Sequence, residues 1–294
     1  MNSENIKVMR KPSIFRLIRR TPLYLWVFRV VLVFMGLMFL YPLIFAFQTS
    51  FKTMKEFYLD MWAMPQQLLF ENYATAWVQG RIGEYFLNSV IISVGTIVLI
   101  ETFAIMASYA LSRLHIPYVE GIILFFFVIQ MLPTETIISP MYLLMSRTGI
   151  MKIPYLPIII GYVGWSLPGT ITIMKNYFDT VPKELLDACR IDGAGEVTAM
   201  FKIVLPLMKG AVATCSIMNF TAAWGELMWA RTATMTTNKG IPLTVGLLNF
   251  QGAYGTDWPL LCAAIIVIAV PLYLMFLFLQ KYFVASLTAG SVKG

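Results

Sequence analysis

The sequence predicts an all-α integral membrane protein with six transmembrane helices. Hydrophobic residues make up 59% of the 294 residues and charged residues 13%, which is about half the charged fraction of a soluble domain. The apolar residues come in long blocks, as is typical of helices that lie in lipid. One polar segment, residues 182–194, interrupts this pattern between the fourth and fifth blocks.

The six spans follow from the apolar blocks. The first, residues 30–47, contains no charge and is long enough to cross most of a bilayer core. A basic segment precedes it, but no small-residue cleavage site follows, so we expect a retained span and not a signal peptide. The other five spans are expected at residues 90–111, 122–144, 153–174, 205–224 and 259–279.

Lysine and arginine predict the orientation of these spans. With a cytoplasmic amino terminus, the inside segments hold 15 of the 22 basic residues and the outside segments hold seven, and cytoplasmic loops carry this excess. We therefore expect both termini in the cytoplasm. Residues 1–29 form a basic cytoplasmic segment, residues 30–285 the transmembrane domain with a cytoplasmic loop at 178–204, and residues 286–294 a cytoplasmic tail. Topology accounts for the net charge of +7, so membrane lipid is an expected partner and nucleic acid is not.

The polar segment has the signals of a short helix. Thr180 is a candidate cap, Pro182 suits the first turn, and Glu184 places an acid near the positive helix end. Gly193 follows as a stop, because glycine tolerates the left-handed conformation. The segment therefore predicts a helix that ends at Asp192-Gly193.

One face of this helix is predicted to be apolar. Leu185, Ala188 and Cys189 share it at helical spacing, and the rim is charged. Such a helix suits docking into a groove of a soluble partner. An amphipathic helix lying on the membrane surface remains the alternative.

At these residues the chain resembles a known family. Binding-protein-dependent ABC transporter permeases carry the cytoplasmic signature E-A-A-x3-G-x9-I-x-L-P. Here Asp187-Ala188-Cys189 takes the place of the triplet, three residues separate it from Gly193, and nine more precede Ile203-Val204-Leu205-Pro206. Asp187 replaces the usual Glu and Cys189 the usual Ala, and both changes are conservative.

Further segments are similar to the carbohydrate branch of that family. Tyr109-Ala110-Leu111-Ser112-Arg113 resembles its Y-A-x-x-R, Asp192-Gly193-Ala194 its D-G-A, and Trp224-Gly225-Glu226 its W-N-E/D. The ending at residues 287–294 is similar to the branch's terminal Gly, Val, Lys and Gly. Together they resemble the maltose-permease-like, smaller of two permease subunits of a sugar importer.

The resemblance implies the ABC type I importer permease fold, with a coupling-helix loop between the fourth and fifth spans. It implies a transport subunit in a bacterial plasma (inner) membrane that carries a sugar, and we expect an oligosaccharide. Expected partners are a second, different permease, an ABC ATPase dimer and an extracytoplasmic solute-binding protein. Glycerol 3-phosphate or another organic solute is the alternative cargo, and an ion-coupled secondary transporter is the rival class.

The sequence offers no chemistry of its own. It contains no G-x-x-x-x-G-K-[ST] phosphate loop, so ATP and Mg are expected on the partner ATPase and no cofactor on this chain. The single histidine, His115, and three cysteines without metal-ligand spacing predict no metal site. We predict no catalytic residue.

Three sets of contact residues follow from the resemblance. ATPase coupling is expected from Glu184, Leu185, Asp187, Ala188, Cys189, Asp192, Gly193 and Ala194. A second ATPase contact is expected from the tail residues Val292, Lys293 and Gly294. Contact with the binding protein is expected from Asn249, Phe250, Gln251, Gly252 and Tyr254.

Polar residues within the spans have two possible roles, in a sugar path or in helix packing. Sugars need hydrogen bonds and aromatic faces, so the candidates to line a sugar path are Gln130, Glu135, Trp165, Asn219 and Trp224. The stronger expectation is that each of them is a helix-packing contact or an interfacial anchor. Glu101, in the middle of the second span, is expected to face the bundle or a neighbouring subunit and to be paired or protonated there.

Overall fold

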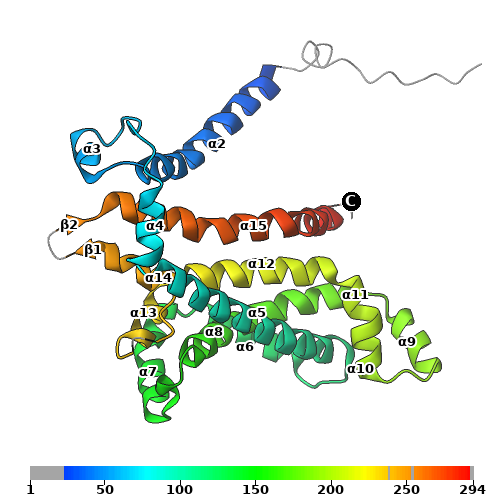
Figure 1. Ribbon diagram of the computed structural model, residues 1–294. Coiled ribbons are helices and arrows are strands. Elements are labelled where there is room, and N and C mark those ends of the chain that lie inside the picture. Colours follow the sequence, from blue (N-terminus) through cyan, green and yellow to red (C-terminus); the bar gives the residue numbers. More distant parts are fainter. Residues whose placement is uncertain (1–22, 238, 253–254, 292–294) are drawn as a thin grey trace, which may run out of the picture.

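The computed structural model describes residues 23–237, 239–252 and 255–291, and most of them are helical (Figure 1). Among the described residues, four helices are long and apolar enough to cross a membrane. They are α2 (Leu23–Thr49), α5 (Ile82–Arg113), α8 (Leu156–Thr180) and α15 (Trp258–Ser291). Two bent helix pairs pass the same test, which gives six spans when each pair counts as one, as predicted.

The third span, predicted at residues 122–144, is sharply bent. The chain forms α6 (Val119–Gln130) and α7 (Thr134–Arg147), whose axes differ by 96°. Pro133 stands at the break with an extended backbone, φ −60° and ψ 129°, and its ring removes the amide that a continuing helix needs. This segment is therefore a broken span or a re-entrant loop.

The fifth span begins later than predicted. Leu205 belongs to a first limb made of α10 (Glu196–Thr198), a π-helical turn (Ala199–Val204) and α11 (Leu205–Leu207). The chain then turns by 80° before α12 (Lys209–Gly225). Met208 at the bend is buried, as are Met200 and Val204 of the first limb, so this limb packs against the bundle.

Short elements connect the spans. On the side where α2 ends they include the helices α3 (Met54–Leu59) and α4 (Glu71–Val78). Between α12 and α15 the chain forms α13 (Met228–Thr234), α14 (Leu243–Gly246), a 3₁₀ turn (Leu247–Phe250) and the strands β1 (Gln251–Gly252) and β2 (Gly255–Thr256). The remaining pieces are a 3₁₀ turn (Ile150–Lys152) and helix α9 (Lys183–Ile191).

Two ends of the bundle carry different structures. Helix α9 projects from one end, next to α10 and α11, and the antiparallel β1–β2 hairpin lies at the opposite end (Figure 1). This arrangement fits the prediction that the loops before and after the fifth span lie on opposite sides of the membrane.

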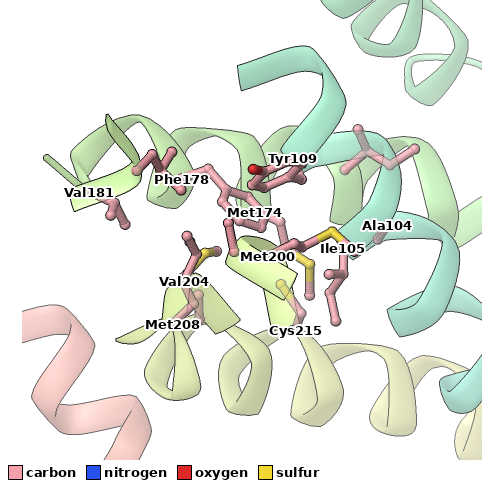
Figure 2. Packing of buried hydrophobic residues seen from close by; sticks show 14 of the residues in the cluster. Ala104, Ile105, Tyr109, Met174, Phe178, Val181, Met200, Val204, Met208 and Cys215 are labelled. Atoms are coloured by element: carbon pink, nitrogen blue, oxygen red, sulfur yellow. The ribbon is translucent and has the colours of Figure 1, made fainter. Parts of the chain in front are cut away.

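A buried apolar cluster holds the α9 end together. Figure 2 shows Tyr109 of α5, Met174 and Phe178 of α8, and Met200 and Val204 of the π-helical turn directed toward one another. Leu186 and Cys189 of α9 belong to the same cluster. Burial of these side chains is the main free energy that fixes α9 on the bundle.

Candidate functional site

Helix α9 starts differently from the prediction. Pro182 is the residue that precedes the helix, with φ −57° and ψ 135°, and Lys183 is its first residue. Thr180 does not cap it, because Thr180 ends α8 and donates its hydroxyl proton to the Tyr177 carbonyl at 2.7 Å. The fixed φ of proline separates α8 from α9.

The end of α9 is a Schellman motif formed around Gly193, as the predicted stop requires. Gly193 has φ +80°. The Ala194 amide donates to the Cys189 carbonyl at 2.9 Å and the Gly193 amide to the Arg190 carbonyl at 3.1 Å. These two bonds satisfy carbonyls that a helix end leaves free, so the chain turns sharply and leads into α10.

The two faces of α9 differ from the predicted division. Leu186 and Cys189 are buried, at 2% and 8% exposure, and Cys189 donates its thiol proton to the Leu185 carbonyl. Leu185 and Ala188 point outward, so Cys189 lies on the opposite, inward side. The outward surface also includes Ile191, which is 87% exposed and which the sequence reasoning missed.

We call the exposed residues of this helix and its end the outer face. From the predicted coupling set it contains Glu184, Leu185, Asp187, Ala188, Asp192 and Gly193. Ala194 is half-buried and packs on the apolar cluster. The outer face therefore combines acidic groups with exposed leucine and isoleucine, which suits binding a protein surface.

A polar network joins α9 to α10 and α5. The Arg190 guanidinium contacts the Asp187 carboxylate at 3.1 Å and the Glu196 carboxylate at 2.9 Å. The Tyr109 hydroxyl donates to the second oxygen of Glu196. The Tyr109 hydrogen bond, together with Arg190, holds the pKa of the Glu196 carboxyl below its ordinary value, and Glu196 raises the pKa of the Arg190 guanidinium.

Arg113 binds the carboxyl end of α8. Its guanidinium donates to the backbone carbonyls of Phe178 and Val181, the latter at 2.6 Å. These are carbonyls at the carboxyl end of a helix, where a cation is favourable. Thus Tyr109 and Arg113, the two ends of the Y-A-x-x-R segment, both bind the region around α9, a role that the sequence did not reveal.

The opposite end carries the predicted binding-protein contacts in mixed positions. Gln251 and Gly252 are exposed on β1, which pairs with β2. Phe250 is buried at 8% exposure within the bundle, so it supports the hairpin and does not project from it. Asn249 donates to the Tyr85 hydroxyl at 3.0 Å. Tyr254, like Val292, Lys293 and Gly294 of the tail, lies outside the described residues.

Two candidate path residues take part in helix packing. Asn219 is buried and donates to the Thr170 hydroxyl at 3.1 Å. Trp224 is 2% exposed, donates its indole proton to the Ile268 carbonyl at 3.0 Å and stacks on Phe220. These contacts favour the packing interpretation for both residues over the path interpretation.

The other candidates are more accessible. Trp165 is half-buried against the rings of Tyr162 and Trp229. Gln130 and Glu135 are exposed on either side of the α6–α7 bend, and the Gln130 amide lies close to Gly169 of α8. All three residues are accessible enough to line a solute path.

Glu101 faces the bundle, as predicted. Its side chain is 9% exposed and one oxygen accepts a hydrogen bond from Ser216 of α12 at 3.1 Å. Its second oxygen has no partner among the described residues. Glu101 therefore joins α5 to α12 inside the membrane.

Comparison with known proteins identifies the class. Residues 102–289 match the family described as binding-protein-dependent transport system inner membrane component. The chain belongs to this family, so it is a multi-pass inner membrane component of an ABC transporter, a transport subunit and not an enzyme, that works with a partner ATPase and a solute-binding protein. The ion-coupled secondary transporter considered above is a different class of protein.

Individual relatives agree with this assignment. The probable ABC transporter permease protein YurM of Bacillus subtilis is 31% identical over 99% of this chain and 94% of its own length. The melibiose/raffinose/stachyose import permease protein MelC of the same organism is 31% identical over 86% of this chain and 91% of its own. The maltodextrin transport system permease protein MdxG, also from B. subtilis, is 34% identical over 71% and 75%.

A solved structure has the same fold. It belongs to a bacterial ABC transporter involved in the import of the acidic polysaccharide alginate, and it matches with a TM-score of 0.75 at 23% identity. The match covers 93% of this chain and 99% of the other. The helical arrangement is therefore that of an ABC importer permease.

Proposed function

We propose that this chain forms part of the pathway of an ABC importer for an oligosaccharide. The support comes from the names of its relatives, whose cargoes include melibiose, raffinose and stachyose, maltodextrin, and diacetylchitobiose. These cargoes are all sugars of two or more units, whereas the alternative cargo, glycerol 3-phosphate, contains no sugar ring. The likeness to these permeases therefore favours an oligosaccharide.

Coupling to the ATPase is assigned to the outer face of α9. The observation that carries this assignment is the division of α9 into a face buried on the bundle and a face that offers Leu185, Ala188 and Ile191 to a partner. Because α9 is fixed on the bundle by its buried face, a force applied to its outer face displaces the whole helix. The chain connects α9 to α8 and to α12, so both helices move with it. ATP and Mg belong to the partner ATPase in this proposal.

The same proposal includes a second permease, the orientation in the membrane and the contact with the solute-binding protein. A second, different permease completes the path, and the support is α2, whose most apolar 18-residue window is only 6% buried within this chain. Both termini and α9 face the cytoplasm, and the basic residues around them support that orientation. The β1–β2 hairpin at the opposite end then faces the solute-binding protein.

Uptake into proteoliposomes tests the cargo. The transporter is reconstituted with its ATPase and binding protein, and uptake of maltotetraose, raffinose and glycerol 3-phosphate is measured with and without ATP. We expect ATP-dependent uptake of at least one oligosaccharide and none of glycerol 3-phosphate. Uptake of glycerol 3-phosphate alone would refute the sugar assignment.

A pair of matched variants tests the coupling face. Leu185→Glu places a charge in the proposed interface, and Leu59→Glu makes the same change at an exposed site of α3. We expect Leu185→Glu to abolish co-purification of the ATPase and Leu59→Glu to preserve it. Equal ATPase retention in both variants would exclude α9 as the docking element.

A further inference from the structure

Helix α5 is joined to the α9 region without a covalent connection. The chain enters α9 from α8 and leaves it through α10 and α11 into α12. A displacement of α9 therefore reaches α8 and α12 along the backbone. Helix α5 ends at Arg113, far earlier in the sequence, so it receives that displacement only through side-chain contacts.

The Tyr109–Glu196 hydrogen bond is the contact that joins α5 to α10. Tyr109 is 4% exposed, and its ring packs edge-on against Phe178 at 5.8 Å. Its hydroxyl nevertheless reaches out of the apolar cluster to the Glu196 carboxylate of α10. A hydrogen bond to a charged acceptor is stronger and more directional than apolar packing, which tolerates sliding.

The carboxylate of Glu196 also binds α9. Its other oxygen is held by Arg190, which also binds Asp187 within α9. The result is a continuous polar chain from α5 through α10 to the outer face of α9. Arg113 adds a second connection, from the end of α5 to the Val181 carbonyl between α8 and α9.

We propose that Tyr109 and Glu196 are positioning residues that make the cytoplasmic end of α5 move as one body with α9. This inference rests on the proposed coupling function of α9. Since α5 packs against both α8 and α12 and contacts Ser216 through Glu101, the link distributes the motion of α9 over three spans. Without it, α5 follows α9 less closely, through its packing on α8 and α12 and through Arg113.

The test uses Tyr109→Phe in the assembled transporter. The substitution keeps the buried ring and removes only the hydroxyl. Tyr177→Phe is the matched control, because Tyr177 packs on the same cluster and its hydroxyl makes no hydrogen bond within the described residues. We expect Tyr109→Phe to lower the stimulation of ATP hydrolysis by the solute-binding protein about fivefold, as loss of one such bond implies, while the ATPase co-purifies normally.

A distance measurement separates positioning from a merely structural role. Spin labels at His115 and Thr198, both exposed, report the separation of α5 from α10. We expect that distance to stay constant between the nucleotide-free and ATP-bound states in the wild type and in Tyr177→Phe, and to change in Tyr109→Phe. Glu196→Ala should reproduce the change, and the double variant should be no worse than the more severe single variant.

The outcomes are distinguishable. Equal stimulation and equal label distances in Tyr109→Phe and Tyr177→Phe would overturn the link while leaving the coupling function of α9 intact. Failure of the ATPase to associate with the wild-type chain would overturn the proposed function, and the link would fall with it.

Discussion

The Ala194 amide donates to the Cys189 carbonyl at 2.9 Å, and this bond closes the carboxyl end of α9. It forms only because Gly193, between the two residues, adopts φ +80°, a conformation that residues with a Cβ atom rarely take. The angle at which α9 leads into α10, and with it the placing of Glu196 next to Arg190, depends on this turn.

The loss of coupling caused by a substitution at Gly193 should depend on the backbone strain that the new residue introduces and not on the size of its side chain. No atom lies within 4 Å of a Cβ at this position, so the cost is conformational, about 1–2 kcal/mol for an ordinary side chain. We expect Gly193→Val to lower ATP-dependent uptake strongly and Gly193→Asn to lower it little, because asparagine tolerates positive φ. Membrane insertion, measured by protease accessibility, should stay normal in both. Equal activity of the two variants would show that the turn is not needed.

Loss of Arg113 should destabilise the α8 end. Arg113→Met removes both hydrogen bonds to the Phe178 and Val181 carbonyls and should cost about 1–3 kcal/mol, since the carbonyls lose a charged donor. Arg113→Lys should retain part of this free energy of unfolding, because an ammonium on a flexible stem can reach one carbonyl at a time. Thermal unfolding in detergent measures the difference, with the exposed His115→Ala as control. A transition temperature of Arg113→Met equal to that of the control would contradict the contact.

The Glu196 network predicts a pH dependence. Because the folded pKa of Glu196 lies below its ordinary value of 4.5, the charged form is favoured by folding. Its contribution to stability is present above the unfolded pKa and disappears as the pH falls through the folded pKa. The stability difference between wild type and Glu196→Gln should thus be constant from about pH 8 to about pH 5.5 and shrink below about pH 4.5. A difference that grows on acidification would have the wrong sign.

Trp224 should behave as a packing residue. Trp224→Phe keeps an aromatic ring against Phe220 but leaves the Ile268 carbonyl without its donor, and we expect a loss of about 1 kcal/mol. The KM for sugar uptake should not change. An increased KM with unchanged thermal stability would return Trp224 to the solute path.

Local sequence signals predicted the features that depend on local chemistry. The apolar blocks of α2, α5, α8 and α15, and the stop at Gly193, each follow from the residues in the segment itself. The size of the bend at Pro133 was not predictable, because proline is tolerated inside membrane helices and nothing in the neighbouring residues fixes whether such a helix continues.

Features that depend on distant partners were not predictable. Leu185 and Leu186 are equally apolar, and only the packing of Leu186 on the cluster of α5 and α8 residues decides which of them faces outward. The Tyr109–Glu196 contact joins residues 87 positions apart, and no spacing rule predicts such a pair. The burial of Phe250 and Trp224 was not predictable for the same reason, because it depends on residues of α5 and α15.

Protection of single cysteines tests the central claim, that the outer face of α9 binds the ATPase. Ala188→Cys places a thiol on that face, Gly252→Cys places one on the hairpin at the opposite end, and the three native cysteines are buried. Maleimide labelling is measured in membranes with and without the ATPase. The account predicts that the ATPase blocks labelling at position 188 and leaves labelling at position 252 unchanged. Equal labelling at position 188 in both preparations would contradict it.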